Sequence, residues 1–404
     1  MSDGAVNADA LRHEVRSWLD EHWTPGRDRR DWLPLVVDAG YAVPTWPESW
    51  CGRGLDADTA AVIAEEFRRV GAPGSGQDVH NLWANTLLTY GTETLKRQLV
   101  RPLLLDQVPM CLLYSEPGAG SDLAGLQTRA ERDGDEFVIT GQKVWTSSAH
   151  TAQYGMLVAR TNWDAPKHGG ISFFFFPMRQ PGVEVRPIKQ ITGESHFNEV
   201  FIDGARVSAA NLLGQLDDGW RVLQTALAYE RSVMGDVARG PRRTGGGDHS
   251  DLPQTGSATD VDLGALARAV GRNDDPLVRQ RIAHVHTLRT VNRWNALRAK
   301  AQLEQGTSSP ILSLGKLAMS QILHTGAGVQ GEILGAEAML AGEGHPRADD
   351  ANFLALNAYF TSIGGGTDQI QRNIIGERVL GLPREPEVDR DVPFRETNRP
   401  PVAR

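Results

Sequence analysis

The sequence has few cysteines, no long apolar run and no excess of positive charge. Cys51 and Cys111 are the only cysteines in 404 residues, which excludes a disulfide framework and a Cys-x-x-Cys zinc or redox site. The apolar run at 173–176 is far too short to cross a bilayer, and the first residues lack the apolar core of a secretory leader. The net charge of −8 disfavours a nucleic-acid partner. These absences predict a cytoplasmic protein that binds neither membranes nor nucleic acids.

Apolar residues make up 40% of the sequence and charged residues 23%, which suits a globular chain of two to three domains. In the first 110 residues the apolar spacing is helical. Ile63, Phe67 and Val70 lie at i, i+4 and i+7, which predicts a helix that begins near its N-cap, Asp58 or Thr59.

The pattern changes to strands between about residues 125 and 210. Short apolar or alternating runs are separated there by turn pairs such as Asp133-Gly134 and Pro181-Gly182. After about residue 215 the helical period returns. Helices, then strands, then helices predict an α+β chain in segregated layers and disfavour a Rossmann fold.

The predicted division is a helical domain over 1–110, a β domain over 111–215, a helical domain over 216–383 and a loose tail over 384–404. A Gly/Pro-rich stretch at 240–257 interrupts the last helical domain and is predicted to be a mobile loop.

Two motifs in the β region could hold a flat ligand. Residues 114–122 read YSEPGAGSD, where glycines and small hydroxyls let backbone N–H groups approach a ligand closely. Residues 141–148 read GQKVWTSS, where Trp145 could stack on a ring while the neighbouring hydroxyls bond to it. Taken singly, the first motif also fits a plain turn and Trp145 also fits a core tryptophan.

Two further motifs lie in the last helical region. Residues 364–372 read GGGTDQIQR, and glycines that lead into a helix form an anion site or an ordinary helix entry. Glu230 and Arg231 follow Tyr229 within a helical stretch, where such a pair is commonly a solvated face. His284 and His286 lie two residues apart in a helical segment, so their rings point to different faces and no metal site is predicted.

In this order and at these distances, the four motifs resemble the acyl-CoA dehydrogenase family, as do NEVFIDGARV and NIIGERVLGLP. The resemblance covers nearly the whole chain. It implies a helical N-terminal domain, a middle antiparallel β domain and a C-terminal four-helix bundle. It also implies noncovalent FAD, an oligomer that is usually a tetramer built as a dimer of dimers, and electron transfer to an electron-transferring flavoprotein.

The implied reaction is α,β-dehydrogenation of an acyl-CoA, or of an acyl-carrier thioester, to the trans-2-enoyl thioester. A base takes the α proton, a donor polarises the thioester carbonyl, and flavin N5 accepts the β hydrogen as hydride. The resemblance implies that Leu112, Tyr114 and Ser115 line the flavin, and that Gly120 and Ser121 lie between flavin and acyl-CoA. It assigns further cofactor contacts to Trp145 and Ser147 at the ring, to Thr367 and Gln369 on the phosphate and adenine side, and to Glu332.

The usual catalytic glutamate is missing from the third motif. Many relatives carry it directly before Gly-Thr, where this chain has Gly365. A second placement in the family is on an earlier helix, directly before an arginine, and here that position is Glu230. Glu230 is therefore predicted to be the general base, while Arg231 helps to position the substrate. The Gly365 N–H can still donate to the thioester oxygen.

A second departure concerns the cofactor. The family commonly has an Arg-x-x-Phe-Gly stretch that contacts the neighbouring subunit's FAD, and here the loop at 240–257 occupies that region. Three readings therefore stay open. The chain is an active dehydrogenase, a non-catalytic partner in a hetero-oligomer, or a flavin monooxygenase or oxidase on the same fold. Its assembly is a homodimer, a homotetramer or a hetero-tetramer.

Overall fold

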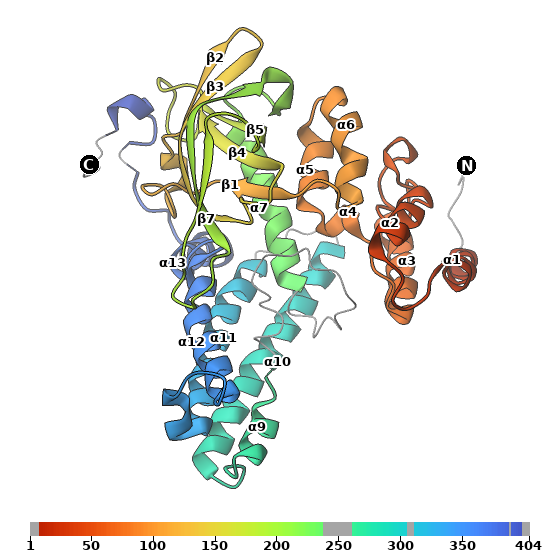
Figure 1. The fold of residues 1–404 in the computed structure, drawn as a ribbon, viewed down its shortest axis with the longest axis vertical. Coiled ribbons are helices and arrows are strands. Elements are labelled where there is room, and N and C mark those ends of the chain that lie inside the picture. Colours follow the sequence, from red (N-terminus) through yellow and green to blue (C-terminus); the bar gives the residue numbers. More distant parts are fainter. Residues whose placement is uncertain (1–7, 237–260, 305–310, 388, 398–404) are drawn as a thin grey trace.

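The computed structural model describes residues 8–236, 261–304, 311–387 and 389–397. A helical part, a sheet and a second helical part follow one another along the chain. Figure 1 shows the sheet at the upper left, the N-terminal helices to its right and the C-terminal helices below. The predicted α+β class is confirmed. Within these residues, no helix combines the length and apolar character needed to cross a membrane.

The N-terminal helices pack around aromatic side chains. Trp32, Tyr41 and Phe67 are buried together, and the Trp18 ring packs against all three. The helices are α1 Ala8–His22, α2 Arg29–Asp38, α3 Ala57–Val70, α4 Gln77–His80, α5 Leu82–Tyr90 and α6 Glu93–Leu104.

The predicted N-cap of α3 was wrong by two residues or more. The Asp56 carboxylate, rather than Asp58 or Thr59, accepts a hydrogen bond from the Thr59 N–H at 2.9 Å. The helix ends as expected at Gly71, whose φ of 70° is the left-handed conformation that glycine adopts without penalty.

The eight described strands form one sheet in the order β6-β7-β3-β2-β4-β5-β8, with β1 paired to β4. The pairing is antiparallel except that β1 and β2 both run parallel to β4. Most pairs are therefore antiparallel, as expected, and β1 and β2 add parallel pairs to β4. The strands are β1 Met110–Leu113, β2 Arg129–Asp133, β3 Glu136–Ser147, β4 Tyr154–Arg160, β5 Ile171–Pro177, β6 Val183–Pro187, β7 Phe197–Ser208 and β8 Leu212–Leu213.

Strand β5 explains the apolar run in the sequence. Its four phenylalanines are fully buried, and alternate side chains point to opposite faces of a strand. Phe173 and Phe175 join the core shared with the N-terminal helices. Phe174 and Phe176 fill the core between the strands. The run is therefore a strand buried on both faces.

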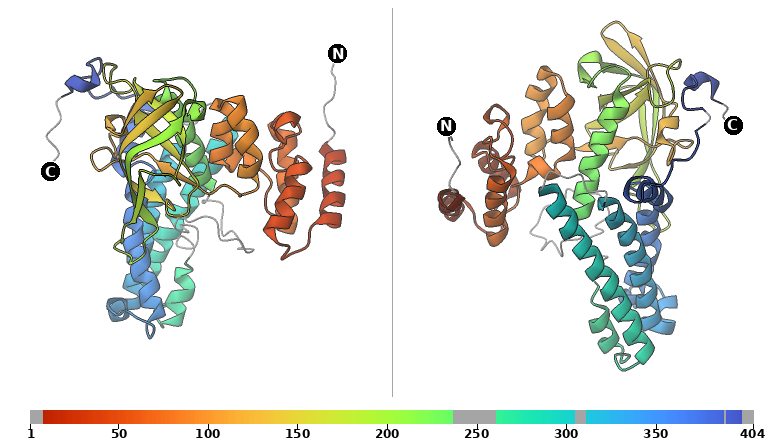
Figure 2. Two further views of the ribbon diagram at one scale, coloured as in Figure 1. Left: turned by 45° about the horizontal axis from the view of Figure 1, so that its top comes forward. Right: turned by 180° about the vertical axis from the view of Figure 1, so that it is seen from behind.

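The C-terminal helices project away from the sheet as a bundle (Figures 1 and 2). Helix α7 packs against both α5 and β5, so it joins the bundle to the other two parts. The helices are α7 Gly219–Asp236, α9 Leu263–Ala269, α10 Pro276–Glu304, α11 Leu312–Leu334, α12 Pro346–Ile363 and α13 Asp368–Ile374. The predicted mobile loop at 240–257 lies outside the described residues.

The tail was expected to be loose, and this is wrong for its last described residues. The Phe394 side chain is only 3% exposed. Its backbone N–H donates to the Ala165 carbonyl at 2.9 Å, and the Arg395 N–H donates to the Trp163 carbonyl at 3.0 Å. One aromatic side chain that finds a buried site is enough to dock the segment, and composition alone did not indicate it.

Candidate active site

The first motif begins where β1 ends. Leu112 and Ser115 are half-buried and Tyr114 is buried, with the Tyr114 hydroxyl 3.6 Å from the Met156 sulfur. The Ser115 carbonyl accepts a hydrogen bond from the Val144 N–H at 2.9 Å. The first motif is therefore bonded directly to the second.

The glycine-rich part of the first motif forms an exposed turn. Glu116 and Ala119 exchange backbone hydrogen bonds of 3.1 and 3.0 Å. Gly120 and Ser121 follow on the surface, and Asp122 pairs with Lys167 at 2.9 Å. Small, exposed residues on a fixed turn leave room for a ligand to approach the backbone.

Trp145 in the second motif lies on the surface in a strained conformation. Its φ is 60°, its side chain is 59% exposed, and the register of β3 against β7 shifts between Lys143 and Thr146. A non-glycine residue in the left-handed region costs about 1–2 kcal/mol. Such strain persists where the surrounding structure imposes it, often at functional sites. The exposed indole is held in this unfavourable backbone conformation beside the half-buried Ser147. In this position it is suited to cover a flat ring.

A buried ion pair, which sequence analysis missed, connects the two motifs. Lys143 Nζ lies 2.9 Å from Glu116 Oε1, and both side chains are buried. Burial lowers the pKa of the Lys143 ammonium, opposed by Glu116. Burial raises the pKa of the Glu116 carboxyl, but Lys143 and hydrogen bonds outweigh it and leave this pKa below its usual value. The two residues lie 27 positions apart in the sequence, so no local pattern indicated the pair.

Aromatic contacts bring the third motif to the second. Trp145 lies edge-on to Phe197 with ring centroids 6.1 Å apart, and Phe197 lies 5.4 Å from Phe360 on α12. A Cβ atom added at Gly364 would come within 2.8 Å of the Phe360 ring. Phe197 and Phe360 carried no signal in the sequence, because residues far apart in the chain make these contacts.

The third motif contains consecutive glycines with positive φ, at 65° for Gly365 and 90° for Gly366. Thr367 caps α13 by accepting the Ile370 N–H at 3.2 Å, and Gln369 is exposed. The Asp368 carboxylate accepts a hydrogen bond from Ser320 at 2.9 Å.

Lys316 on α11 completes the anchor of this turn. Its ammonium lies 3.6 Å from Asp368 and donates to the Thr361 carbonyl. Burial lowers the pKa of Lys316, and the Asp368 carboxylate opposes this shift. The glycine turn is thus held from α11 and α12.

The structure does not bring Glu332 to these residues. Glu332 is exposed near the other end of α11, where it pairs with Arg281 at 3.5 Å and its carbonyl accepts a hydrogen bond from Arg272. Sixteen residues of helix separate it from Lys316, which is about 24 Å at 1.5 Å per residue. Glu230 and Arg231 belong to α7, but their side chains lie outside the described residues.

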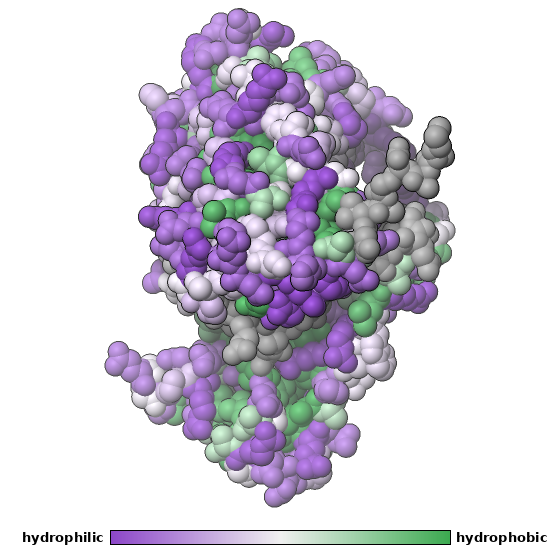
Figure 3. Space-filling view, turned by 90° about the vertical axis from the view of Figure 1, so that its right-hand side faces the viewer, coloured by the Kyte–Doolittle hydropathy of each residue, from purple (hydrophilic) through white to green (hydrophobic). Residues whose placement is uncertain are grey.

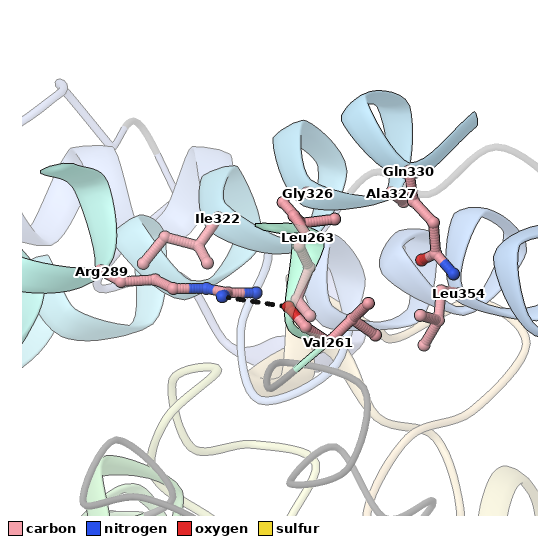
Figure 4. A pocket seen from close by; sticks show the side chains of 9 residues that line it. Val261, Leu263, Arg289, Ile322, Gly326, Ala327, Gln330 and Leu354 are labelled. Atoms are coloured by element: carbon pink, nitrogen blue, oxygen red, sulfur yellow. Dashed lines mark hydrogen bonds between the residues drawn. The ribbon is translucent and has the colours of Figure 1, made fainter. Parts of the chain in front are cut away.

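Two cavities can be compared with these motifs, and neither is lined by a motif residue. The cavity in Figure 4 lies within the bundle, where Arg289 Nη1 donates to the Val261 carbonyl at 3.4 Å. Its volume of about 10 Å³ suits at most one water molecule. The other, about 480 Å³, lies between Asp38 and Arg53 in the N-terminal helices. Gly120, Ser121, Trp145 and Gln369 of the motifs lie on the exposed surface of the single chain.

The comparisons with known proteins agree along the whole chain. The acyl-CoA dehydrogenase N-terminal, middle and C-terminal domain models match residues 7–105, 111–204 and 265–380. The acyl-CoA dehydrogenase IpdE1 of Mycobacterium tuberculosis is 37% identical over 409 aligned residues, which cover 94% of this chain and 99% of that protein. The chain belongs to the acyl-CoA dehydrogenase family.

Solved acyl-CoA dehydrogenases share the fold. The Tcur3481-Tcur3483 steroid ACAD gives a TM-score of 0.70 at 28% identity, over 94% of this chain and 98% of that one. The ChsE4-ChsE5 complex from Mycobacterium tuberculosis gives 0.66 at 27% identity, over 95% and 100%. The predicted family, enzyme class and FAD cofactor are confirmed. This acyl-CoA dehydrogenase is an FAD-dependent oxidoreductase, and the exposed Trp145 beside the half-buried Ser115 and Ser147 fits a flavin ring.

Proposed function

We propose that this acyl-CoA dehydrogenase uses Glu230 as its base and acts on a bulky acyl-CoA within an oligomer. The turn at 364–366 carries the proposal. Gly365 has φ 65° and Gly366 φ 90°, a region that favours glycine and penalises any side chain. Family members with a glutamate before Gly-Thr place their base there. Because this turn is built for glycine, the carboxylate has to come from another element, and Glu230 on α7 matches the family's second placement.

Each proposed catalytic residue then has a defined role in the reaction. Glu230 takes the α proton as the general base. The Gly365 N–H donates to the thioester oxygen, which stabilises the charge that develops there. Arg231 positions the substrate. Bound FAD supplies the hydride acceptor.

Further residues are proposed to hold FAD. Around the ring, the direct bond between the Ser115 carbonyl and the Val144 N–H supports a site that uses both β motifs. Thr367 and Gln369 are proposed for the phosphate and adenine side. Glu332, at the far end of α11, is proposed to contact the FAD of a neighbouring subunit. The proposed ring contacts are Leu112, Tyr114, Ser115, Gly120, Ser121, Trp145 and Ser147, and Ser121 also touches substrate.

The bundle surface supports an oligomer. Figure 3 shows apolar side chains over the lower part of the molecule, where the bundle lies. Trp294 and Leu297 on α10, and Tyr359 and Ile363 on α12, are each at least 60% exposed. Exposed apolar groups of this size mark protein interfaces. Two solved relatives are described as paired chains, Tcur3481-Tcur3483 and ChsE4-ChsE5, which favours a hetero-tetramer over a homodimer or homotetramer.

A bulky substrate follows from similarity to one of these proteins. The Tcur3481-Tcur3483 assembly is named a steroid ACAD, so a CoA thioester with a steroid-derived acyl group is the proposed substrate. A thioester on an acyl-carrier protein is the alternative. Electron-transferring flavoprotein is the proposed electron acceptor, and a cytoplasmic location stays a prediction from the sequence.

Anaerobic bleaching of the flavin tests the substrate and the base together. The purified assembly is mixed with straight-chain, branched and steroid-derived acyl-CoAs, and with an acyl-carrier thioester. Loss of the 450 nm flavin band is expected with the steroid-derived acyl-CoA. The Glu230→Gln variant keeps FAD but reduces it at least 1,000-fold more slowly, because its amide cannot take the α proton.

Three outcomes would contradict the proposal in different ways. Wild-type reduction rates in Glu230→Gln would place the base elsewhere. A colourless assembly would identify the chain as a non-catalytic partner subunit. Oxygen consumption by the reduced flavin without enoyl product would identify a monooxygenase or oxidase.

A further inference from the structure

The pair formed by Glu116 and Lys143 hydrogen-bonds to the backbone of the first motif, of β4 and of the segment at 127–128. The Lys143 side chain is 0% exposed and Glu116 is 8% exposed. The ammonium has three protons, and it donates to the Tyr114 carbonyl at 3.1 Å, the Val158 carbonyl at 2.8 Å and Glu116 Oε1 at 2.9 Å. Because all three of its protons are bonded, the Lys143 ammonium is held in one orientation.

On the Glu116 side, the pair closes the loop that carries the first motif. Glu116 Oε2 accepts the Gln127 N–H at 2.6 Å, and Oε1 accepts the Thr128 N–H at 2.9 Å. One carboxylate thus ties position 116 to positions 127 and 128. The exposed Gly120 and Ser121 lie within the closed loop.

On the Lys143 side, the pair fixes the start of the bulge that presents Trp145. In a regular strand, residues 143 and 145 would point to the same face. Here Lys143 points into the core while Trp145 is largely exposed, because the register shifts between Lys143 and Thr146. A bulge re-aims a side chain in this way, and the buried ammonium holds its first residue in place.

Stability alone does not account for this arrangement. Moving two charges out of water is costly, and apolar residues of similar volume commonly serve the stability of a fold as well or better. A buried pair does, however, allow one arrangement of its partners where an apolar contact allows several. Here the partners are the backbone at Tyr114, beside Ser115, and the strand that leads into Trp145.

We propose that Glu116 and Lys143 are positioning residues that set the spacing between the Ser115 backbone and the Trp145 indole, and so the fit of the flavin ring. This inference rests on FAD binding, which the family establishes, and not on the choice of base or substrate. FAD affinity and the flavin spectrum therefore test it independently of turnover.

The test compares the wild-type assembly with the double variant Glu116→Gln/Lys143→Met. Removing both charges avoids leaving one of them buried without a partner. The variant is expected to keep its melting temperature within a few degrees. Its FAD dissociation constant, followed by the fluorescence of released FAD, should rise at least tenfold, and the visible circular dichroism of the bound flavin should change.

Glu66→Gln is the matched control. Glu66 is also buried and accepts from Arg12, Arg16 and Arg69 in the N-terminal helices. Its loss should lower the melting temperature and leave both flavin readouts unchanged. The proposal is overturned if the folded double variant binds FAD with wild-type affinity and an unchanged spectrum.

A milder variant covers the case in which the double variant does not fold. Glu116→Asp keeps the charge but is one methylene too short to reach Lys143, Gln127 and Thr128 together. At least a threefold rise in the FAD dissociation constant is expected, and a value equal to that of wild type would refute the positioning role.

Discussion

At the scale of single residues, backbone strain and burial divide the candidate site into two kinds of position. Trp145 and Gly365 both have positive φ, but only glycine adopts it freely. The glycine lets the turn form without strain. The tryptophan keeps an unfavourable conformation on the surface, where its ring packs edge-on against Phe197. The strained backbone conformation at Trp145 thus places its indole ring on the surface.

Trp145→Gly separates the role of that ring from its effect on folding. Glycine relieves about 1–2 kcal/mol of backbone strain, and the lost contact with Phe197 is worth about 0.5–1.5 kcal/mol. The free energy of unfolding, measured by urea titration of the FAD-free protein, should therefore change by less than about 1 kcal/mol. The FAD dissociation constant should rise at least tenfold. A large loss of stability with normal FAD affinity would show that Trp145 is a structural residue.

At the scale of elements, the C-terminal segment is attached to the loop that follows the first motif. Arg160 at the end of β4 is fully buried and donates to the carbonyls of Ala124 and Leu126. Phe394 lies over its guanidinium, 3.4 Å from the ring centroid to Cζ. The C-terminal segment thus covers the Arg160 guanidinium, whose hydrogen bonds hold the loop after the first motif.

Phe394→Ala tests that attachment. Truncating a buried phenylalanine costs about 3–5 kcal/mol, and loss of the cation–π contact adds to it. The Phe394 and Arg395 amides donate to the backbone carbonyls of residues 165 and 163. Without the buried ring these hydrogen bonds should open more often, so hydrogen exchange of both amides should become at least tenfold faster.

Arg395→Ala is the control for this change. It removes an exposed ion pair with Asp164, which is worth about 0–1 kcal/mol, so exchange should stay near the wild-type rate. Equal effects of the two substitutions would contradict a role for the buried ring.

Local sequence predicted the elements better than the contacts between them. The Asp133-Gly134 and Pro181-Gly182 turns were predicted correctly because their glycines adopt the left-handed conformation, with φ of 62° and 83°, which local sequence determines. The Glu116–Lys143 pair and the Phe197–Phe360 contact join segments 27 and 163 residues apart, so no local pattern encodes them. The four motifs were found because family resemblance carries such long-range information, and the docked Phe394 was missed because it lies outside them.

At the scale of the whole molecule, the exposed apolar face of the bundle predicts assembly through α10. Val291, Trp294 and Leu297 are spaced three residues apart and are at least 45% exposed. This spacing places them within about 120° of the helix circumference, so they form one face. Burying that face against a partner would stabilise the assembly by about 25 cal/mol per Å² of apolar area removed from water.

Trp294→Asp should therefore break the assembly without unfolding the chain, because a charge cannot be buried in the interface without a partner. Light scattering should show at least a twofold lower mass, while far-UV circular dichroism stays unchanged. Leu216→Asp, at an isolated exposed leucine, is the control and should keep the wild-type mass. An unchanged mass for Trp294→Asp would rule out this face. Loss of FAD together with loss of mass would show that a neighbouring subunit completes the cofactor site, as the position of Glu332 at the far end of α11 leads us to expect.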